Sequence, residues 1–384
     1  MQHEVEAWVL YAGEKGNPQP TELKHESITF DAISSEEVLV RPLYGCWEGN
    51  MGHALERKPV DICHLRGEDK VVIGNAGVVE ILDVGSEVTT VRPGDKAILF
   101  CNGQWDHYGY PMKIFGFDTP GTIGMLAKKT KLHQKQVIPI PAENKFDLVR
   151  WAAFSLRYVT AWSNFRLAYG MLRLQMSEKE LPVPVVWGWG GGVSLAELHL
   201  ARLRGCRTFQ VSSRKDRQDT AERLGITPID RNEFANLNFD EDRYKTDKDY
   251  KKQYLESERR FLDIVDSLTQ GRGVNIFLDY VGSPVLRATL KAMARQGIIA
   301  TAGWKDGMSS WFIRAIECID RHQHIHTHYA RYSEGVQAVQ FALANEWLPI
   351  VDSHVYSYDE VPQLAEDYGS GKFTYFPCFK VNEE

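Results

Sequence analysis

The pattern of hydrophobic and polar positions changes near residue 154, and this change predicts two domains. Before it, short β-branched runs alternate with Gly and Pro, as in "EEVLVRPL", "VVIGNAGVVEILDVG" and "VRPGDKAILF". Short strands joined by tight turns produce this rhythm. Pro93 followed by Gly94 suits a type II turn in the last run. The first segment is therefore expected to form a small antiparallel β-barrel.

From Phe154 the apolar residues follow helical spacing in "RWAAFSLRYVTAWSNFRLAYGML", and strands then alternate with helices. The candidate strands are "VPVVWG", "RTFQVSS", "TPID", "NIFLDYVG", "GIIATAGW" and "HIHTHYA". This alternation predicts a parallel sheet with right-handed crossovers. The charged insertion from Arg231 to Arg260 is expected to be a solvated loop and helix. After His328 a helix, "SEGVQAVQFALAN", precedes a β-like tail, "HVYSY" and "YFPCFKV", expected to return to the first barrel.

Length and charge exclude some classes of protein. With 384 residues and 43% hydrophobic content, the chain exceeds the size of one core, which also favours two domains. Its net charge of -6, with Lys and Arg dispersed among acids, provides no basic field for nucleic acid. No run approaches the roughly 18 apolar residues of a membrane span, and "MQHEVEAWVL" lacks the order of a signal peptide. A cytoplasmic location is expected. The six cysteines form no CxxC pair, which favours reduced thiols.

A glycine-rich turn, "WGWGGGVSLAE" at 187–197, joins the apolar run "PVPVV" to the helical pattern "VSLAELHLARLRG". Between a buried strand and a helix, such a turn bends the chain sharply and admits a pyrophosphate to the backbone N–H groups. It therefore predicts a dinucleotide site, with a tight turn that binds nothing as the alternative. The residues expected to contact the cofactor here are Gly188, Gly190, Gly191, Gly192 and Val193.

The second strand of the sheet bears on which dinucleotide is bound. After "TFQV", where Asp or Glu would meet a ribose without a 2′-phosphate, the chain offers Ser212, Ser213, Arg214 and Lys215. Hydroxyls and cations suit a phosphate, so NADPH is predicted in preference to NADH. A solvated basic loop is the alternative.

The order of elements resembles the medium-chain dehydrogenase/reductase superfamily over essentially the whole chain, on "EEVLVRPL", "GNAGVVEILDVGSEVTTVRPGDKAILF", "YVTAW", the glycine turn and "FLDYVGS". The resemblance implies an α/β protein with a GroES-like β-barrel catalytic domain at 1–153 and 331–384. It implies a Rossmann NADPH-binding domain with a doubly wound parallel sheet at 154–330. It also places Thr160, Gly282 and Gly303 at the cofactor and implies a homodimer formed through edge strands of the Rossmann sheets.

Within that superfamily the chain is similar to crotonyl-CoA carboxylase/reductases, which reduce 2-enoyl thioesters with NADPH. The similarity rests on "IFGFDT", "WGWGGGVS", "QVSSRKDRQDTAERLGITPIDRNE" and "HTHYARYSEGV". In the CO2 pocket of those enzymes it matches Phe117 and Asp118 to a Phe–Glu pair, His328 to a His, and Asn50 to an Asn. Asp is a methylene shorter than Glu, so a water bridge to His328 is not expected to keep the same geometry. This argues against carboxylation.

Each of these four residues also has a purely structural interpretation. Asn50 suits a turn cap, Phe117 the barrel core and Asp118 an acceptor of turn N–H groups. His328 belongs to a run, "HQHIHTH", in which His322, His324, His326 and His328 share one face of a strand. Such a row of imidazoles offers a minor chance of a metal site.

The zinc ligands of the related alcohol dehydrogenases are not reproduced in the sequence. Where those enzymes have "GHE", this chain reads "GNAG", so Asn75 and Ala76 replace His and Glu, and Cys46 is a remnant of the first ligand. In "ICHL", treated as a strand, Cys63 and His64 point to opposite faces and chelate poorly. Cys63 is expected in the core and His64 on the surface. A metal-free site is predicted.

These observations predict a zinc-independent, NADPH-dependent oxidoreductase that reduces the conjugated C=C of an enoyl thioester or an enone. The thioester would be carried by coenzyme A or a carrier protein, and Arg314 and Arg321 are candidate contacts for a coenzyme A phosphate. An NADPH-dependent carbonyl reductase or alcohol dehydrogenase acting on a small metabolite is the second hypothesis. A nucleotide-binding homologue without redox activity is the third, because Trp189 is expected to stand beside the pyrophosphate turn.

Overall fold

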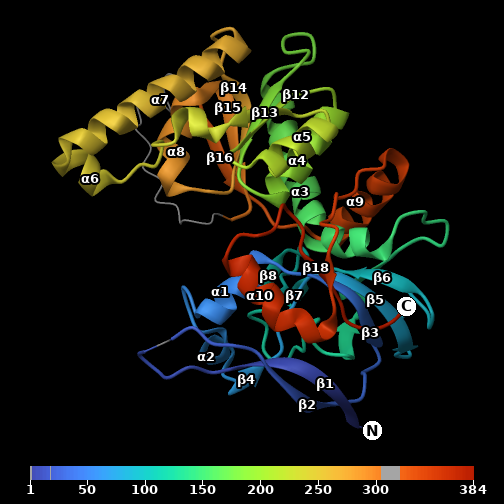
Figure 1. Cartoon of the computed structure of the whole chain (residues 1–384). Helices are drawn as coiled ribbons and strands as arrows, with labels where there is room; N and C mark the ends of the chain where they lie inside the picture. The colour runs from blue at the N-terminus through green and yellow to red at the C-terminus, as the bar shows by residue number, and fades with distance from the viewer. Residues whose placement is uncertain (1, 18, 304–320) are drawn as a thin grey trace. The chain divides into compact units, whose positions relative to one another are not determined.

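The computed structural model describes residues 2–17, 19–303 and 321–384, and the chain divides into two compact units (Figure 1). Unit 1 comprises Met1–Val159 and Ala330–Glu384, and unit 2 comprises Thr160–Tyr329. The first crossing between the units lies within the long helix α3 (Leu148–Gln175). Among the described residues, no helix is long and apolar enough to cross a bilayer.

Unit 1 is built mainly from β-strands, as expected from its short β-branched runs. A seven-stranded sheet contains the order β10-β6-β5-β3-β18-β17, with β9 also paired to β3. A second sheet has the order β2-β1-β4, and β7 and β8 form a hairpin. The strands are β1 (Gln2–Tyr11), β2 (Lys24–Asp31), β3 (Glu37–Cys46), β4 (Lys70–Val71), β5 (Gly77–Val84), β6 (Lys96–Leu99), β7 (Asn102–Trp105), β8 (Pro111–Ile114), β9 (Thr130–His133), β10 (Val137–Pro139), β17 (Val355–Tyr356) and β18 (Cys378–Lys380).

Two local predictions for unit 1 are confirmed. The turn before β6 has Gly94 at φ +90°, and the Asp95 N–H donates to the Arg92 carbonyl at 3.1 Å. The C-terminal tail returns to the first sheet, because β18 pairs antiparallel with β3 and places Cys378 opposite Cys46. The helices of unit 1, besides the start of α3, are α1 (Gly49–Glu56), α2 (Ile62–Arg66), α9 (Tyr332–Asn345) and α10 (Val361–Gly369).

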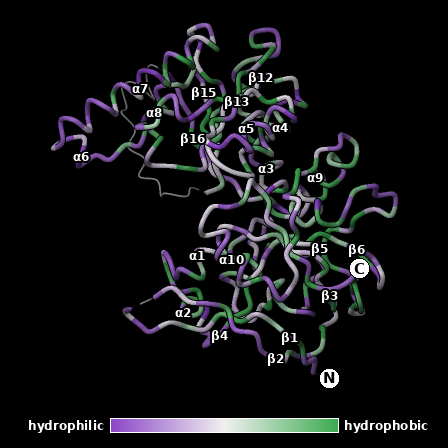
Figure 2. Tube along the Cα trace, viewed as in Figure 1, coloured by the Kyte–Doolittle hydropathy of each residue, from purple (hydrophilic) through white to green (hydrophobic). Residues whose placement is uncertain are grey.

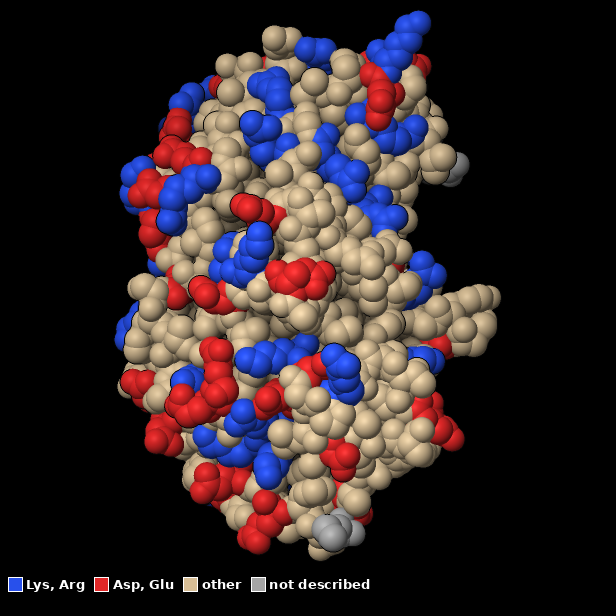
Figure 3. All heavy atoms as spheres, turned by 90° about the vertical axis from the view of Figure 1, so that its right-hand side faces the viewer, with Lys and Arg blue, Asp and Glu red and all other residues tan. Residues whose placement is uncertain are grey.

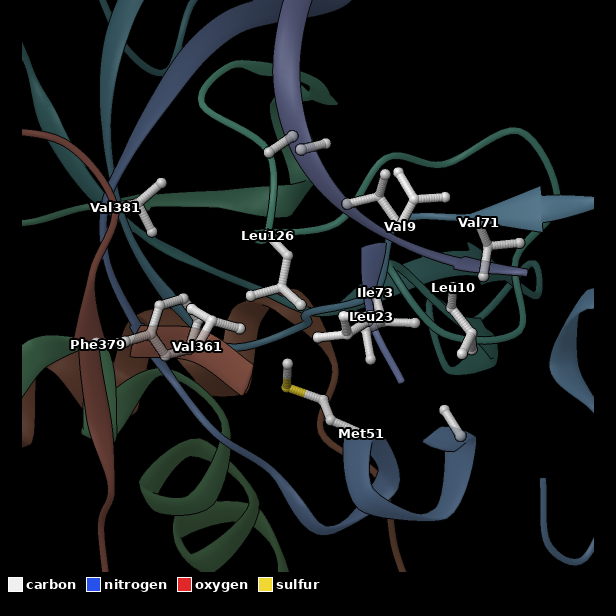
Figure 4. Packing of buried hydrophobic residues seen from close by; sticks show 14 of the residues in the cluster. Val9, Leu10, Leu23, Met51, Val71, Ile73, Leu126, Val361, Phe379 and Val381 are labelled. Atoms are coloured by element: carbon white, nitrogen blue, oxygen red, sulfur yellow. The ribbon is translucent and has the colours of Figure 1, made fainter. Parts of the chain in front are cut away.

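One apolar cluster holds α1 and the C-terminal tail against the strands of unit 1. In Figure 4, Met51 from α1 points toward Leu23 and Ile73, while Phe379 and Val361 approach Leu126 from the tail. Met51 is 1% exposed, so burying it fixes the helix that carries Asn50.

Unit 2 is a six-stranded parallel sheet with the strand order β13-β12-β11-β14-β15-β16. This is the doubly wound order of a dinucleotide fold, in which β11 and β12 begin one half and β14 begins the other. The strands are β11 (Val185–Trp189), β12 (Arg207–Ser212), β13 (Thr227–Asp230), β14 (Val274–Asp279), β15 (Met293–Thr301) and β16 (His324–Thr327). All six strands expected from the sequence are present.

Helices cover both faces of this sheet (Figure 1). They are α4 (Gly192–Leu203), α5 (Lys215–Arg223), α6 (Glu241–Thr246), α7 (Lys248–Thr269) and α8 (Ser283–Ala292). Figure 1 shows α7 and α8 on one side of the sheet and α4 and α5 on the other. The charged insertion forms α6 and α7, which are largely hydrophilic in Figure 2. The expected helix is thus present and continues past Arg260 to Thr269, and its buried Tyr254 packs into the core of unit 2.

Acidic and basic side chains lie close together over much of the face drawn in Figure 3. Exposed ion pairs also occur on the helices of unit 2, such as Lys215 with Asp219 at 2.6 Å on α5 and Lys245 with Glu241 at 2.6 Å on α6. Fully exposed pairs of this kind contribute little to stability, because water and salt screen them.

Three expectations from the sequence need correction. First, "ICHL" is part of α2 and not a strand, because the Asp61 carboxylate caps the helix by accepting the Cys63 N–H at 2.9 Å. Cys63 is nevertheless buried and His64 exposed, as expected. Second, the helical pattern begins at Leu148, before Phe154.

The third correction concerns Trp189, which does not stand beside the glycine turn. Trp189 is 2% exposed and packs against Phe261 and Phe277, with ring centroids 5.1 and 5.5 Å away. Its indole N–H donates to Thr289 Oγ1 at 2.7 Å. Because side chains alternate along a strand, Trp187 and Trp189 share one face of β11 and Gly188 lies on the other. The indole therefore leaves the turn accessible, and the argument for a redox-inactive homologue loses its basis.

We predict that Met51→Ala lowers the free energy of unfolding by about 2–5 kcal/mol, because it removes a fully buried side chain from a packed cluster. Chemical denaturation followed by circular dichroism measures this loss. The control is Leu65→Ala, whose side chain is 56% exposed and which should cost less than about 0.5 kcal/mol. Equal losses in the two variants would show that Met51 does not anchor α1.

Candidate functional site

The glycine turn of unit 2 brings α4 close to β11 and leaves the start of the helix open. A Cβ placed on Gly188 would lie 2.2 Å from Ser194 Oγ, so only glycine permits this approach. Gly190 has φ +100°, a conformation that side chains disfavour. A Cβ there would lie 3.5 Å from the Cβ of Tyr280. Gly191 is the N-cap of α4, with open space where its Cβ would lie.

The start of α4 provides donors suited to an anion. The first N–H groups of a helix have no carbonyl partner within it, and the helix dipole places partial positive charge there. In α4 these groups belong to Gly192, Val193 and Ser194, which follow the turn directly. The arrangement can bind a phosphate or pyrophosphate through the backbone alone.

The loop after β12 holds the residues predicted to contact a 2′-phosphate. The Ser212 hydroxyl accepts the Arg214 N–H at 3.2 Å, and the Ser212 carbonyl accepts from Gln218. The Arg214 guanidinium donates to both oxygens of Asp216, at 3.0 and 2.5 Å. Lys215 pairs with Asp219. Both cations therefore have a carboxylate partner that a bound phosphate would have to replace or join.

A buried carboxylate organises the turn between β14 and α8. Asp279 Oδ1 accepts the N–H groups of Val281 and Gly282 at 3.0 and 2.9 Å, and Oδ2 accepts from Thr289 at 3.3 Å. Burial raises the pKa of Asp279 to about 6, while these hydrogen bonds act in the opposite direction. Asp279 thus fixes Gly282, one of the residues predicted to contact the cofactor, at the N-cap of α8.

A second buried carboxylate, Glu197 on α4, belongs to a polar cluster that sequence reasoning missed. The Tyr280 hydroxyl and the Asn164 amide both donate to Glu197 Oε1, the latter at 3.2 Å. Asn164 Nδ2 lies 2.9 Å from the Tyr280 hydroxyl, and Asn164 Oδ1 lies 3.0 Å from His326 Nε2. The signal in the sequence was a single Glu inside the otherwise apolar run "VSLAEL".

Within the described residues, the histidine row of β16 is not part of a group of three or more metal-binding side chains. His324 Nε2 lies 3.1 Å from Gln175 Oε1, and His326 Nε2 lies 3.0 Å from Asn164 Oδ1, so two of its imidazoles bind amides of α3. His322 lies outside the strand with φ +51°. His328 directly follows the strand and is half-buried.

Asn50, the candidate amide of unit 1, lies in the first turn of α1 next to a buried ion pair. Arg157 Nε donates to Glu48 Oε2 at 2.7 Å, and its other nitrogens donate to the carbonyls of Trp47 and Tyr375. Burial raises the pKa of Glu48, but the adjacent guanidinium, which stays charged, retains the ion pair. This pair fixes the chain that leads into Asn50. Asn50 Oδ1 is buried and accepts no hydrogen bond from a described residue.

Phe117 and Asp118 lie in the turn that follows β8, also in unit 1. Asp118 Oδ1 accepts the Ile114 N–H at 2.5 Å, which is the structural role considered for it. Phe117 is half-buried and packs on the same cluster as Met51. Both side chains therefore have structural partners, and the second carboxylate oxygen of Asp118 is the part available for other contacts.

The remaining predicted residues are distributed along unit 2. Thr160 is its first residue and lies half-buried within α3. Gly303 follows β15, and its N–H donates to Thr301 Oγ1 at 3.2 Å. Arg321 donates to the carbonyls of Leu290 and Lys291, whereas Arg314 lies outside the described residues.

Asn75 and Ala76, matched by sequence to the His and Glu of "GHE", are each 1% exposed. Burial and the neighbouring Cys378 raise the pKa of the Cys46 thiol, which disfavours the thiolate that a metal requires. Within the described ranges, no three His, Cys, Asp or Glu side chains gather in a metal-binding group.

Known enzymes with solved structures have the same fold as this chain, and the similarity covers both units. The crotonyl-CoA carboxylase/reductase AntE in complex with NADP is 20% identical, with a TM-score of 0.80 over 99% of this chain and 95% of that one. The 2-octenoyl-CoA carboxylase reductase CinF, solved with NADP and 2-octenoyl-CoA, is 19% identical, with a TM-score of 0.79 over 98% and 87%. An alcohol dehydrogenase from Aeropyrum pernix has the same fold and is 20% identical, with a TM-score of 0.73 over 98% of this chain and 99% of that one.

Two curated relatives extend the comparison. A medium chain reductase/dehydrogenase of an Acremonium species is 24% identical over 261 residues, covering 63% of this chain and 80% of that protein. A phenolphthiocerol/phthiocerol polyketide synthase of Mycobacterium tuberculosis is 23% identical over 316 residues, or 79% of this chain. The match spans only 12% of the length of that synthase. No protein-family model matches the chain.

The fold is that of the medium-chain dehydrogenases and reductases, with a GroES-like unit and a Rossmann unit, as the sequence predicted. Among the solved proteins with this fold, the crotonyl-CoA carboxylase/reductases named in the prediction are structural neighbours of the chain.

We predict that Arg157→Met lowers the free energy of unfolding by about 3–5 kcal/mol, since it leaves the Glu48 carboxylate buried without its cation. Urea denaturation monitored by circular dichroism measures the loss. Arg41→Met is the control, because it breaks a half-exposed pair with Glu80 and should cost at most about 1 kcal/mol. If the control lost as much stability as Arg157→Met, the buried pair would have no special role.

Proposed function

We propose that this chain is a zinc-independent, NADPH-dependent oxidoreductase that reduces the C=C bond conjugated to a thioester or a ketone carbonyl. The observation that carries the proposal is the open glycine turn at the start of α4, together with the Ser212–Lys215 loop at the end of the adjacent strand. Parallel sheets bind dinucleotides at this edge, where β11 and β14 diverge.

NADPH is supported by two features of unit 2. The N–H groups of Gly192 and Val193 suit the pyrophosphate, while the Ser212 hydroxyl and the Arg214 guanidinium suit a 2′-phosphate. The chain has no Asp or Glu at 212–215 to bind a free ribose 2′-hydroxyl. NADP is also the ligand in the AntE and CinF structures.

Bound NADPH would supply a hydride to the β-carbon of the substrate. Negative charge then develops on the carbonyl oxygen and the α-carbon, and the protein has to stabilise it and deliver a proton. We assign the first role to the Asn50 amide, whose Nδ2 is a donor on a helix fixed by Met51 and the Glu48–Arg157 pair. We assign proton delivery to His328, and contacts with the substrate to Phe117 and Asp118.

The substrate class is supported by the relatives. CinF is described with 2-octenoyl-CoA, and the mycobacterial relative is a polyketide synthase. We therefore propose an enoyl thioester carried by coenzyme A or by a carrier protein. Because Asp118 replaces the longer Glu and already accepts a backbone N–H, we propose simple reduction without CO2 fixation. We also propose a cytoplasmic homodimer that associates through edge strands of the Rossmann sheets.

A carbonyl reductase or alcohol dehydrogenase is the second candidate. The alcohol dehydrogenase neighbours share the fold, and Asp118 and His328 would serve as a proton relay in the reduction of a ketone. The lack of a zinc-ligand set at Asn75 and Ala76 favours the enoyl substrate, because the related dehydrogenases polarise their carbonyl with the metal.

We predict that the double variant Arg214→Ala/Lys215→Ala raises the Kd for NADPH about 10- to 100-fold and leaves the Kd for NADH unchanged, because only NADPH has the 2′-phosphate. Isothermal titration with both nucleotides tests this. Arg243→Ala/Lys245→Ala removes two exposed cations of α6 and should change neither value. An equal rise in the Kd for NADPH and the Kd for NADH would show that the loop does not recognise the 2′-phosphate.

For the reaction, we predict that deuterated NADPH and a 2-enoyl-CoA yield a saturated acyl-CoA with one deuterium on C3 and no added CO2. Mass spectrometry locates the label. Treatment with 1,10-phenanthroline should leave the rate unchanged, since no metal polarises the carbonyl. Reduction confined to ketones, or a rate lost on chelation and restored by zinc, would support the second candidate instead.

A further inference from the structure

The buried polar cluster of Asn164, Glu197, Tyr280 and His326 has no role in the reaction proposed above. Its members come from α3, α4, the β14–α8 turn and β16, all within unit 2. Glu197 is 0% exposed, in the second turn of the helix whose start forms the candidate pyrophosphate site. A buried carboxyl in this position is costly unless it is paired or uncharged.

The cluster connects the two turns that border the candidate nucleotide site. The base of the Tyr280 side chain lies against the glycine turn, since a Cβ on Gly190 would be 3.5 Å from the Tyr280 Cβ. The Tyr280 hydroxyl reaches past that turn and donates to Glu197 on α4. Tyr280 also immediately follows Asp279, whose carboxylate fixes Val281 and Gly282. Glu197 therefore holds the β14–α8 turn against the glycine turn through one side chain.

The surroundings of Glu197 favour the uncharged carboxyl. Burial raises its pKa to about 8, against the effect of the hydrogen bonds from Tyr280 and Asn164. The groups that face it are the Tyr280 hydroxyl and the Asn164 amide, and the next is His326. Burial lowers the pKa of His326 to about 4, so this imidazole is neutral at pH 7. Oε2 of Glu197 is buried and has no hydrogen-bond partner among the described residues.

We propose that Glu197, in its uncharged form, is a positioning residue for the dinucleotide, and that its ionisation weakens nucleotide binding. An ionised Glu197 would place an uncompensated negative charge in the interior of unit 2, in the helix that receives the anionic pyrophosphate. Binding of the nucleotide would then require uptake of one proton above the pKa of Glu197. This inference rests on the proposed function, because it assumes that the glycine turn binds NADPH.

The test is the Kd for NADPH measured by isothermal titration from pH 7 to 9.5, with the wild-type chain and Glu197→Gln. Gln keeps the size and the hydrogen bonds of the uncharged carboxyl. For the wild type, the Kd should rise above about pH 8 by up to tenfold per pH unit, or about 30-fold at pH 9.5. For Glu197→Gln it should stay nearly constant, because the titrating group is gone. The 2′-phosphate, whose second pKa is about 6, is already mostly ionised at pH 7, so its charge changes little over this range.

A second variant tests the connection to the turn. Tyr280→Phe removes the hydroxyl that donates a hydrogen bond to Glu197, and it should raise the Kd for NADPH at pH 7. The melting temperature of the variant shows whether it still folds. Tyr356→Phe is the matched control, since it removes a hydroxyl that donates to Asp367 at 2.7 Å in unit 1. The control should bind NADPH normally.

The same pH profile in the wild type and Glu197→Gln would overturn the inference, as would unchanged binding by Tyr280→Phe. Failure of all variants and the wild type to bind NADPH at any pH would instead overturn the proposed function. The two failures are therefore distinguishable.

Discussion

The close approach of α4 to β11 at Gly188 is the constraint on which the candidate site depends. A side chain there would meet Ser194 Oγ at 2.2 Å and push the helix away from the strand. Because α4 lies so close to β11, its first N–H groups are at the edge of the sheet, directly after the sharp bend at Gly190. The opposite face of the same strand carries Trp187 and Trp189, which pack on Phe261 and Phe277. One short strand thus separates the candidate anion-binding turn from a packed aromatic core.

Two buried carboxylates complete this edge in different ways. Asp279 accepts backbone N–H groups and fixes the turn into α8, while Glu197 accepts side-chain donors and connects that turn to α4. Burial raises the pKa of both, to about 6 and about 8. At neutral pH the first is mostly ionised and supported by its N–H donors, and the second is mostly protonated. The environment of each carboxylate therefore decides which part of the turn it holds and how it responds to pH.

The sequence was most informative where local physics determines the structure. Alternating strands and helices, the glycine turn and the Pro93–Gly94 turn follow from periodicity and backbone freedom, and all were found. Two local features were misread, and one non-local feature could not be predicted from the sequence. Trp189 was placed at the turn because it is adjacent in sequence, although strand alternation sends it into the core, and "ICHL" was read as a strand although Asp61 caps it as a helix. The Asn164–Glu197–Tyr280–His326 cluster joins residues up to 162 positions apart, so no local pattern could predict it. The roles of Asn50, Phe117, Asp118 and His328 remain predictions.

The central claim is that the start of α4 binds the pyrophosphate of NADPH and that the loop after β12 binds the 2′-phosphate of the same molecule. Hydrogen exchange resolved to short peptides, with and without NADPH, tests this most directly. The account predicts slower exchange in residues 188–194 and 212–215, with the charged helices α6 and α7 unchanged. Slower exchange elsewhere, with no protection of either segment at saturating NADPH, would contradict it.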